Sequence, residues 1–181
     1  MSILKVARMG HPILRTVADA IPDEMLRSPE IQQLIDDMVD TMVEYDGVGL
    51  AAPQVHQSWR LFVMEVPSDS PRYGETGAVQ PLTIVVNPEY SPIGDDHVES
   101  MEGCLSIPDV MGLVPRHERI KVRFQGRDGK LVEGELSGFP AIVFQHEYDH
   151  LDGVLYIDRM ESLETLSFRR EYERFGRLDG E

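Results

Sequence analysis

Two histidines and a glutamate within five residues form the pattern with the clearest chemical meaning in this sequence. The segment 145–150 reads Gln-His-Glu-Tyr-Asp-His, so His146 and His150 are four residues apart. In a helix this spacing places both imidazoles on one face, where they can bind the same metal ion. Glu147 could then take a proton from a water bound to that metal. The alternative is a core helix whose two histidines bond only to backbone groups.

The residues around this pattern favour a buried helix. Apolar side chains lie on both sides of the histidines, as expected for a helix that is enclosed all round. These side chains are Ala141, Ile142, Val143, Phe144, Leu151 and Val154. Pro140 suits the first turn of such a helix, and Gly153 suits its C-terminal end. We therefore predict a helix that begins near Gly138 and stops at Gly153.

A catalytic metal site of this type usually has three protein ligands and one open position, so a third ligand must come from elsewhere in the chain. Cys104, the single cysteine, lies in a glycine-containing turn after a predicted strand and could bind as a thiolate. By position alone, Asp158, Glu161 and Glu164 compete for this role. A lone cysteine can also be a small buried apolar residue or a nucleophile. The nucleophile needs a histidine partner, and both nearby histidines belong to the helix.

A second segment with chemical potential is rich in small residues. Residues 47–54 read Gly-Val-Gly-Leu-Ala-Ala-Pro-Gln. Glycine and alanine let a backbone approach another molecule closely. No Gly-Lys-Ser/Thr follows, so the segment lacks the signature of a phosphate-binding loop. It is either a tight turn into a strand or an edge that contacts a substrate and delivers the amide of Gln54 to a reacting centre.

The elements that must position these residues can be read from the rest of the chain. Ser28 suits an N-cap and Pro29 a first helical residue, and apolar residues then recur at intervals of three and four up to Gly47. Residues 1–27 are predicted to form an extended arm with a helical turn after Pro12, and 67–81 a surface loop. Strands are predicted at 59–66, 81–87, 98–101, 113–116, 119–124, 131–136 and 155–157, and a last helix at 161–177.

This order indicates an α+β fold in which antiparallel or mixed β-sheets pack around the buried helix, with an N-terminal and a C-terminal helix. The 181 residues are enough for one domain with a real core, and we expect residues 1–181 to form a single domain. The net charge of −15 argues against binding to DNA or RNA phosphates. A single cysteine, no signal peptide and no long apolar stretch predict a cytoplasmic protein that does not bind membranes.

Three motifs together give a sharper expectation. GVGLAAPQ at 47–54, EGCLS at 102–106 and QHEYDHLDG at 145–153 closely resemble the motifs of peptide deformylases, in the same order and with familiar spacing. Each motif is moderately specific, and the combination is very specific. The resemblance covers nearly the whole chain and implies a single catalytic domain. It implies removal of the N-formyl group from the initiator methionine of new polypeptides, with release of formate.

The resemblance also implies roles for individual residues. Cys104, His146 and His150 are expected to bind the metal, and Glu147 to act as general acid and base. Gln54 and the backbone N–H of Leu105 are expected to stabilise the oxyanion. The methionine side chain is expected in an apolar pocket, while the backbone of Gly49 pairs with an extended peptide. The residues that match the pocket are Val48, Phe139, Ile142 and Val143, with Glu102 and His146 in its wall.

The sequence departs from the family pattern at Met111, where some members carry an arginine. This leaves the preference for peptide length open. The expected cofactor is one divalent metal ion, Fe(II) in the cell, with Zn(II), Ni(II) or Co(II) as alternatives. The expected partners are N-formylmethionyl nascent peptides. A transient ribosome contact through Arg169, Arg170, Arg174 and Arg177 is a further hypothesis, set against a solvated helix with mixed charges. Two other functions remain open: a peptidase, and a binding module with a structural metal.

Overall fold

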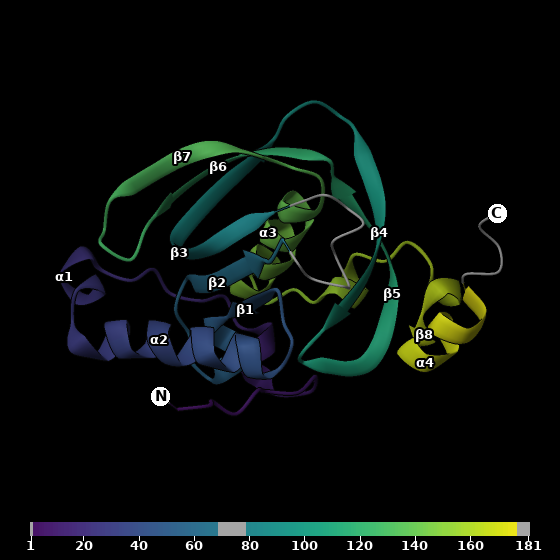
Figure 1. Ribbon diagram of the computed structural model, residues 1–181, viewed down its shortest axis with the longest axis horizontal. Helices are drawn as coiled ribbons and strands as arrows, with labels where there is room; N and C mark the ends of the chain where they lie inside the picture. Colours follow the sequence, from purple (N-terminus) through teal and green to yellow (C-terminus); the bar gives the residue numbers. More distant parts are fainter. Residues whose placement is uncertain (1, 69–78, 177–181) are drawn as a thin grey trace.

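The computed structural model describes residues 2–68 and 79–176, and two β-sheets and two longer helices make up most of it (Figure 1). The larger sheet has the strand order β1-β2-β3-β6-β7, and the smaller has the order β4-β5-β8. All pairings between these strands are antiparallel, which confirms the predicted α+β class. The strands of the larger sheet are β1 Gly49–Ala51, β2 Leu61–Val66, β3 Gln80–Pro92, β6 Arg119–Gln125 and β7 Leu131–Ser137. The predicted loop at 67–81 falls mostly outside the described residues.

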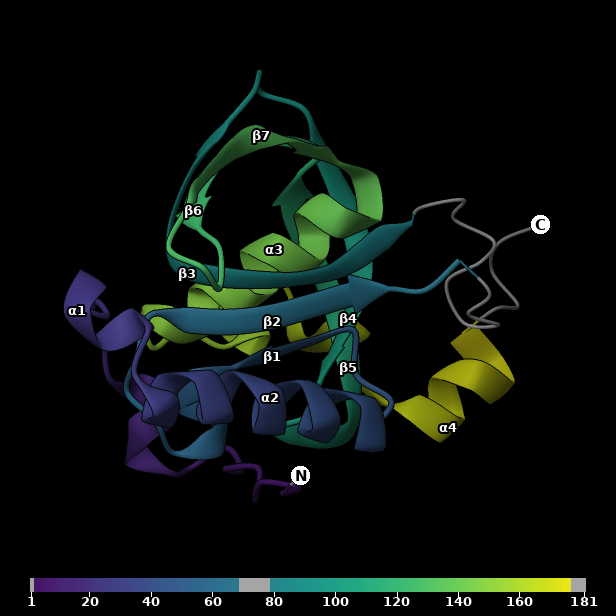
Figure 2. The ribbon, with the colours of Figure 1, turned by 60° about the vertical axis from the view of Figure 1, so that its left-hand side comes forward.

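Strand β2 is buried on both faces because a helix covers each side of the sheet around it. Phe62 and Met64 pack into the cluster that contains residues of the helix α3, Gly138–Leu151. Leu61 and Val63 alternate with them and pack into the cluster that contains residues of the helix α2. Figure 2 shows α2 below β1 and β2, with α3 on the opposite side. This double burial explains why the predicted strand is a continuous apolar run rather than an alternating one.

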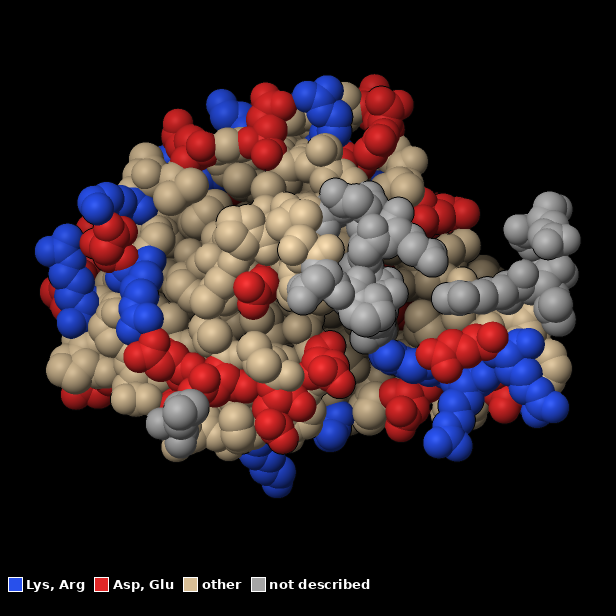
Figure 3. Space-filling view, in the orientation of Figure 1, with Lys and Arg blue, Asp and Glu red and all other residues tan. Residues whose placement is uncertain are grey.

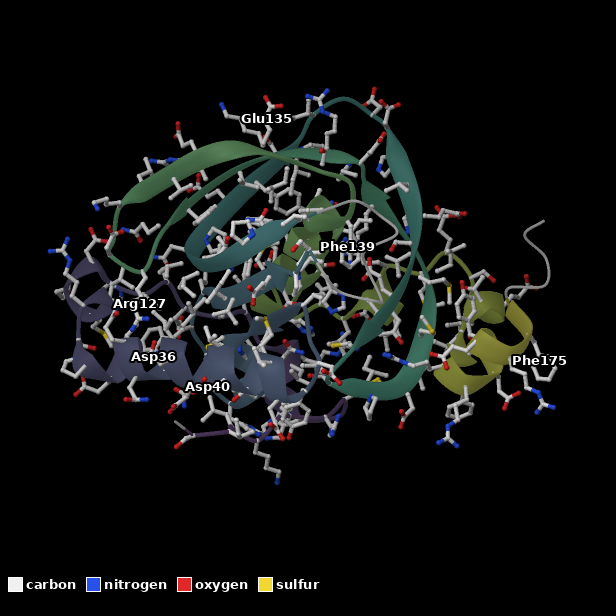
Figure 4. The ribbon with its side chains drawn as sticks, viewed as in Figure 1. Asp36, Asp40, Arg127, Glu135, Phe139 and Phe175 are labelled. Carbon is white, nitrogen blue, oxygen red and sulfur yellow. The ribbon has the colours of Figure 1, made fainter. Side chains whose placement is uncertain are left out.

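Helix α2, Pro29–Glu44, begins where the sequence predicts it and ends just before Gly47. The Ser28 hydroxyl accepts a hydrogen bond from the N–H of Ile31 at 3.3 Å, which caps the first turn. On the outer face, Arg127 in the turn between β6 and β7 donates to Asp36 at 2.6 Å (Figure 4). This ion pair ties the exposed side of the helix to the far end of the larger sheet.

The smaller sheet carries the cysteine. Its strands are β4 His97–Cys104, β5 Ile107–His117 and β8 Ser167–Phe168. In the β4–β5 hairpin Gly103 pairs with Met111, and the register then shifts before Cys104. The cysteine therefore stands at the irregular end of a strand, where the backbone turns and its side chain can leave the plane of the sheet.

Helix α3, Gly138–Leu151, is the predicted histidine helix, and it is buried along almost its whole length. Figures 1 and 2 both show it enclosed between the curved larger sheet and the smaller sheet. Gly153 lies just past its end with φ 70°, a conformation that favours glycine. A Cβ at Gly153 would also lie 2.7 Å from the carbonyl carbon of Arg15, so the chain beyond the helix packs directly against the N-terminal arm.

The N-terminal arm, residues 2–22, runs beneath the helix and both sheets. It contains the predicted helical turn, the 3-10 helix Pro12–Arg15, and it leads into a short helix that the sequence did not indicate, α1 Asp23–Leu26. The backbone N–H groups of the arm donate to one carbonyl oxygen in each motif segment, at 2.7–2.8 Å: Ala7 to Gln54, Met9 to Ser106 and Ala18 to Leu151. The arm therefore holds the three segments together.

The strands predicted at 81–87 and 113–116 are longer in the structure, Gln80–Pro92 and Ile107–His117, and two other predicted elements differ in kind or in where they begin. The predicted strand at 155–157 is wrong, because Tyr156–Asp158 forms a 3-10 helix in which Asp158 accepts a hydrogen bond from the N–H of Leu155 at 2.8 Å. The predicted helix at 161–177 begins later, because Ser167–Phe168 pairs with β5 as strand β8. Within the described residues the helical parts of this segment are the 3-10 helix Leu163–Thr165, α4 Arg169–Glu171 and the π-helix Tyr172–Gly176. No helix of the described chain is long and apolar enough to span a membrane.

Candidate active site

Three predicted ligands come together from two elements. The thiol of Cys104 and one ring nitrogen each of His146 and His150 lie within 4.8 Å of one another. The Sγ atom is 3.2 Å from Nε2 of His150. Burial by itself raises the pKa of Cys104, but the two histidines outweigh burial and hold that pKa well below its ordinary value. A thiolate between two imidazoles is therefore the favoured form, and it is the form that binds a metal.

A carboxylate fixes the orientation of the His146 ring on the side away from Cys104. Its Nδ1 donates to Glu102 Oε2 at 2.8 Å, which leaves Nε2 to face Cys104. Glu102 in turn accepts two hydrogen bonds from Arg116, at 2.7 and 2.9 Å. Burial raises the pKa of Glu102, but the hydrogen bonds from Arg116 and His146 outweigh it and bring the pKa to about 2. A carboxylate that orients a ligand imidazole is a common arrangement at metal sites.

Arg116 links this carboxylate to helix α3. Its Nη1 donates to Asp149 at 2.6 Å. Asp149 also accepts hydrogen bonds from Arg159, at 2.8 and 3.2 Å, which the sequence did not indicate. The network thus joins β4, β5 and α3 through buried, paired charges, and the exposed Arg159 connects it to the segment after α3.

Glu147 points toward the ligands from the same helix turn. Its Oε2 is buried and has no hydrogen-bond partner among the described residues. Burial raises the pKa of this carboxyl to about 7. The carboxylate lies against the backbone of Gly49, where a Cβ would stand 2.7 Å from Glu147 Cδ. The glycine at position 49 leaves room for this side chain, and a Cβ there would displace it.

Gln54 belongs to the motif at 47–54 and lies close to the predicted metal ligands. It lies in the 3-10 helix Ala52–Val55 and is almost fully buried. Its Oε1 accepts a hydrogen bond from the N–H of Ala51 at 2.8 Å, which fixes the orientation of the amide. The Nε2 group then donates to Ser106 Oγ at 3.2 Å and to Cys104 Sγ at 3.5 Å. The amide N–H groups therefore face the thiolate side of the site.

An open cleft of about 880 Å³ leads to these groups. The residues predicted to bind substrate all line it: Val48, Gly49, Glu102, Phe139, Ile142 and Val143. So do most of the predicted reactive residues: Gln54, Cys104, Leu105, His146 and Glu147. Figure 4 shows Phe139 near the middle of the molecule, at the beginning of α3. His150 is not among the lining residues and lies behind the others, buried.

The donor set fits a divalent metal ion. Two imidazoles and a thiolate form the mixed nitrogen and sulfur set that Zn(II), Fe(II), Co(II) and Ni(II) accept. The carboxylic acids that competed for the third position do not reach it. Asp158 forms an ion pair with Arg15, and Glu161 and Glu164 are exposed. Within the described residues, the group of Cys104 and the two histidines is the one cluster of this kind.

One cleft residue had been assigned to another role from sequence. Arg169 was placed in a charged stripe on the C-terminal helix, yet it lines the cleft together with Met111. The periodicity of the helix could not reveal this, because the position of Arg169 depends on the pairing of the two-residue strand β8 with β5.

A buried His-Glu-x-x-His helix, a cysteine from a second sheet and an adjoining cleft are the features of a metal-dependent hydrolase. A family model described as Polypeptide deformylase matches residues 3–166. Peptide deformylase 2 of Nostoc sp. is 43% identical over 171 residues, which cover 94% of this chain and 93% of that protein. The chain belongs to the peptide deformylase family.

Solved structures agree with this assignment. A class I type b peptide deformylase from Acinetobacter baumannii, bound to Met-Ala-Ser, superimposes with a TM-score of 0.83 at 39% identity. The match covers 88% of this chain and 99% of that one. Peptide deformylase from Thermotoga maritima gives a TM-score of 0.79 at 40% identity, over 90% of this chain and all of that one.

Proposed function

We propose that this protein removes the formyl group from the N-terminal formylmethionine of new polypeptides and releases formate, and that residues 1–181 form one catalytic domain. The observation that carries the proposal is the meeting of Cys104, His146 and His150 beside Glu147 at the cleft. A formyl amide is a weak electrophile, so its hydrolysis needs an activated water and a polarised carbonyl. The side chains at this cleft are of the types that meet both needs.

The metal would be held by Cys104, His146 and His150, and when bound it supplies Lewis-acid activation of water and of the formyl carbonyl. Glu147 takes the proton from the attacking water on its carboxylate and returns it to the departing amine. Its buried, unpartnered oxygen and its raised pKa suit both transfers. The amide of Gln54 and the backbone N–H of Leu105 face the negative charge that develops on the formyl oxygen.

The peptide is proposed to lie between two strand edges. Within the described sheets, β1 is one of the two edge strands of the larger sheet and β4 is one of the two edge strands of the smaller sheet. Gly49 in β1 and Gly103 in β4 both line the cleft, so an extended peptide can pair with backbone on either side. The apolar side chains of Val48, Ile142 and Val143 would take the methionine. The Met-Ala-Ser bound to the A. baumannii relative is consistent with such a peptide.

Formate release is the direct test. The protein is purified without air, loaded with Fe(II) and mixed with N-formyl-Met-Ala-Ser, with the unformylated peptide as control. Fe(II) is the proposed ion, and parallel samples loaded with Zn(II), Co(II) and Ni(II) compare the alternatives. Turnover that requires the formyl group and stops on chelation supports the proposal. Absence of turnover with one bound metal per chain would contradict it.

Because the substrate is a new polypeptide, we also propose that the protein is cytoplasmic and that its C-terminal segment contacts the ribosome transiently. We propose no binding to DNA or to membranes. Arg170 and Arg174 are exposed, and basic side chains gather over this end of the molecule among acidic ones (Figure 3). Phe175 is 51% exposed and points outward (Figure 4). Arg177 lies outside the described residues. Co-sedimentation with ribosomes should fall when Arg170 and Arg174 are both changed to Glu, and a retained signal would contradict the contact.

A further inference from the structure

Arg169 reaches the cleft from the opposite edge of the smaller sheet. It follows β8, which pairs with β5 at Val110 and Met111, and β5 separates β8 from β4. Its side chain nevertheless lines the cleft that holds the candidate reactive groups, and it is partly buried there. The guanidinium therefore crosses the sheet instead of extending into solvent as the neighbouring, exposed Arg170 does.

A glycine in β4 makes this crossing possible. Gly103 pairs with Met111, so these two residues lie side by side beneath the path of the arginine. A Cβ on Gly103 would lie 3.3 Å from Nη2 of Arg169, closer than side chains ordinarily pack. A larger residue would push the guanidinium away. Gly103 directly precedes Cys104, one of the predicted metal ligands. A peptide whose formyl group lies at those ligands would therefore pass beside the guanidinium of Arg169.

The charge of this guanidinium has no counterpart among the described residues. Arg8, another cationic residue that lines the cleft, donates to the carbonyl oxygen of Leu105 at 2.5 Å. The structure gives Arg169 no hydrogen bond or ion pair within residues 2–68 and 79–176. Four acidic residues besides Glu147 also line the cleft, but Glu102 is held by Arg116, and Asp46, Glu65 and Asp109 form no ion pair with Arg169 within the described residues. A guanidinium in this setting presents its donors to an incoming carboxylate.

We propose that Arg169 is a specificity-determining residue that favours formylated peptides with a carboxylate beyond the formylmethionine. The carboxylate belongs either to an acidic side chain or to the free C-terminus of a short peptide. This inference rests on the proposed deformylase function and adds a substrate preference to it. The preference acts on binding of the peptide, so it is expected mainly in KM.

Paired peptides test the proposal. Formyl-Met peptides with an amidated C-terminus carry Glu or the isosteric Gln at the second, third or fourth position. Formyl-Met-Ala-Ser is used as the free acid and as the amide, which separates the C-terminal carboxylate from the acidic side chain. We compare the Fe(II)-loaded wild type with Arg169→Gln, and with Arg170→Gln as the matched control one residue away.

In the wild type, kcat/KM for the carboxylate peptide should exceed that of its neutral partner by about fivefold in at least one pair. The ratio should approach one in Arg169→Gln and stay at the wild-type value in Arg170→Gln. It should also shrink as salt is raised, because the contact is partly open to solvent.

Turnover of all peptides with a ratio near one in the wild type would overturn this inference and leave the proposed function standing. An unchanged ratio in Arg169→Gln would overturn it as well, since the preference would then come from another group. Failure of the metal-loaded wild type to release formate from any of the formylated peptides would overturn both proposals.

Discussion

At the scale of single residues, the site depends on a glycine that leaves space as well as on the side chains that fill it. Gly49 has no Cβ, and the carboxylate of Glu147 occupies the space where one would be. The sequence indicated that the small residues at 47–54 allow a close approach, and it attributed this to the substrate. The structure adds that the same glycine makes room for the enzyme's own carboxylate.

Replacing Gly49 with Ala should therefore displace Glu147 and impair the reaction more than the fold. We expect kcat for formate release to fall about 10²-fold or more, because Glu147 is the proposed general base and a displaced base loses most of its contribution. Steady-state kinetics and thermal unfolding of the metal-loaded variant measure the two effects. Gly134→Ala is the control, because a Cβ at this exposed strand position meets nothing within 4 Å. Equal kcat in the two variants would contradict the packing argument.

The lowered pKa of Glu102 predicts that the stability of the folded protein is sensitive to acid. Its pKa in the folded protein is about 2, against an ordinary value of 4.5. Because the folded value is depressed, the stabilisation is complete above the unfolded pKa and is lost as the pH falls from about 4.5 toward 2. The difference corresponds to roughly 3 kcal/mol of unfolding free energy. Glu102→Gln should lack this part of the pH dependence.

Urea unfolding at pH 5 and pH 3 measures this pH dependence of stability. A chelator is present so that metal release does not contribute. The free energy of unfolding should drop more steeply with pH in the wild type than in Glu102→Gln. Parallel curves for the two proteins would show that the carboxylate is not held as the structure indicates.

At the scale of elements, buried charges connect the strand that carries the cysteine to the helix that carries the histidines. Arg116 in β5 binds Glu102 in β4 and Asp149 in α3, and all three side chains are at least 94% buried. Hydrogen bonds on both sides of the guanidinium fix the distance between the two elements. The ligands can therefore be held in place before a metal binds.

Removing the central cation should cost stability. Arg116→Met removes the cation that the buried carboxylates of Glu102 and Asp149 share, although His146 and Arg159 still bind them. We expect the free energy of unfolding to fall by about 3–5 kcal/mol. Arg123→Met is the control, because the ion pairs of Arg123 are more than half exposed and should contribute less than about 1 kcal/mol. Urea denaturation of both variants gives the comparison. Similar losses in the two would contradict the importance of the buried network.

The elements themselves were largely predictable where a local rule decides them. The spacing of His146 and His150 and the apolar flanks specified α3, and the Ser28-Pro29 signal specified the start of α2. The strand predicted at 155–157 failed because Leu155 and Tyr156 are buried by a 3-10 turn, in which the Asp158 side chain also accepts a hydrogen bond from the N–H of Leu155. Apolar pattern alone does not distinguish these two forms of burial.

At the scale of the whole molecule, the N-terminal arm determines how the three motifs meet. Its backbone binds the carbonyl groups of Gln54, Ser106 and Leu151. No local pattern in the arm indicates these long-range contacts, and the same holds for Arg169, which reaches the cleft through pairing between distant strands. The sequence identified the candidate ligands and the three motifs. The contacts that hold them together required the structure.

The contact between the arm and the end of α3 can be tested at Gly153. Gly153 and Gly94 both have positive φ, 70° and 76°, so Ala at either position costs about 1 kcal/mol of backbone strain. A Cβ at Gly153 would in addition press on the backbone of Arg15, whereas one at Gly94 meets nothing within 4 Å. Gly153→Ala should therefore lose about 1–3 kcal/mol more than Gly94→Ala in urea unfolding. Equal losses would mean that the arm is not packed there.

The central claim is that Glu147 moves the proton at a site whose metal is held by Cys104, His146 and His150. The most direct measurement is formate release by Glu147→Gln together with its metal content, because this substitution removes the carboxylate and keeps the side chain's shape. We predict one metal ion per chain, as in the wild type, and a fall in kcat of about 10²–10⁴-fold. Wild-type kcat in a fully metal-loaded Glu147→Gln protein would contradict the account.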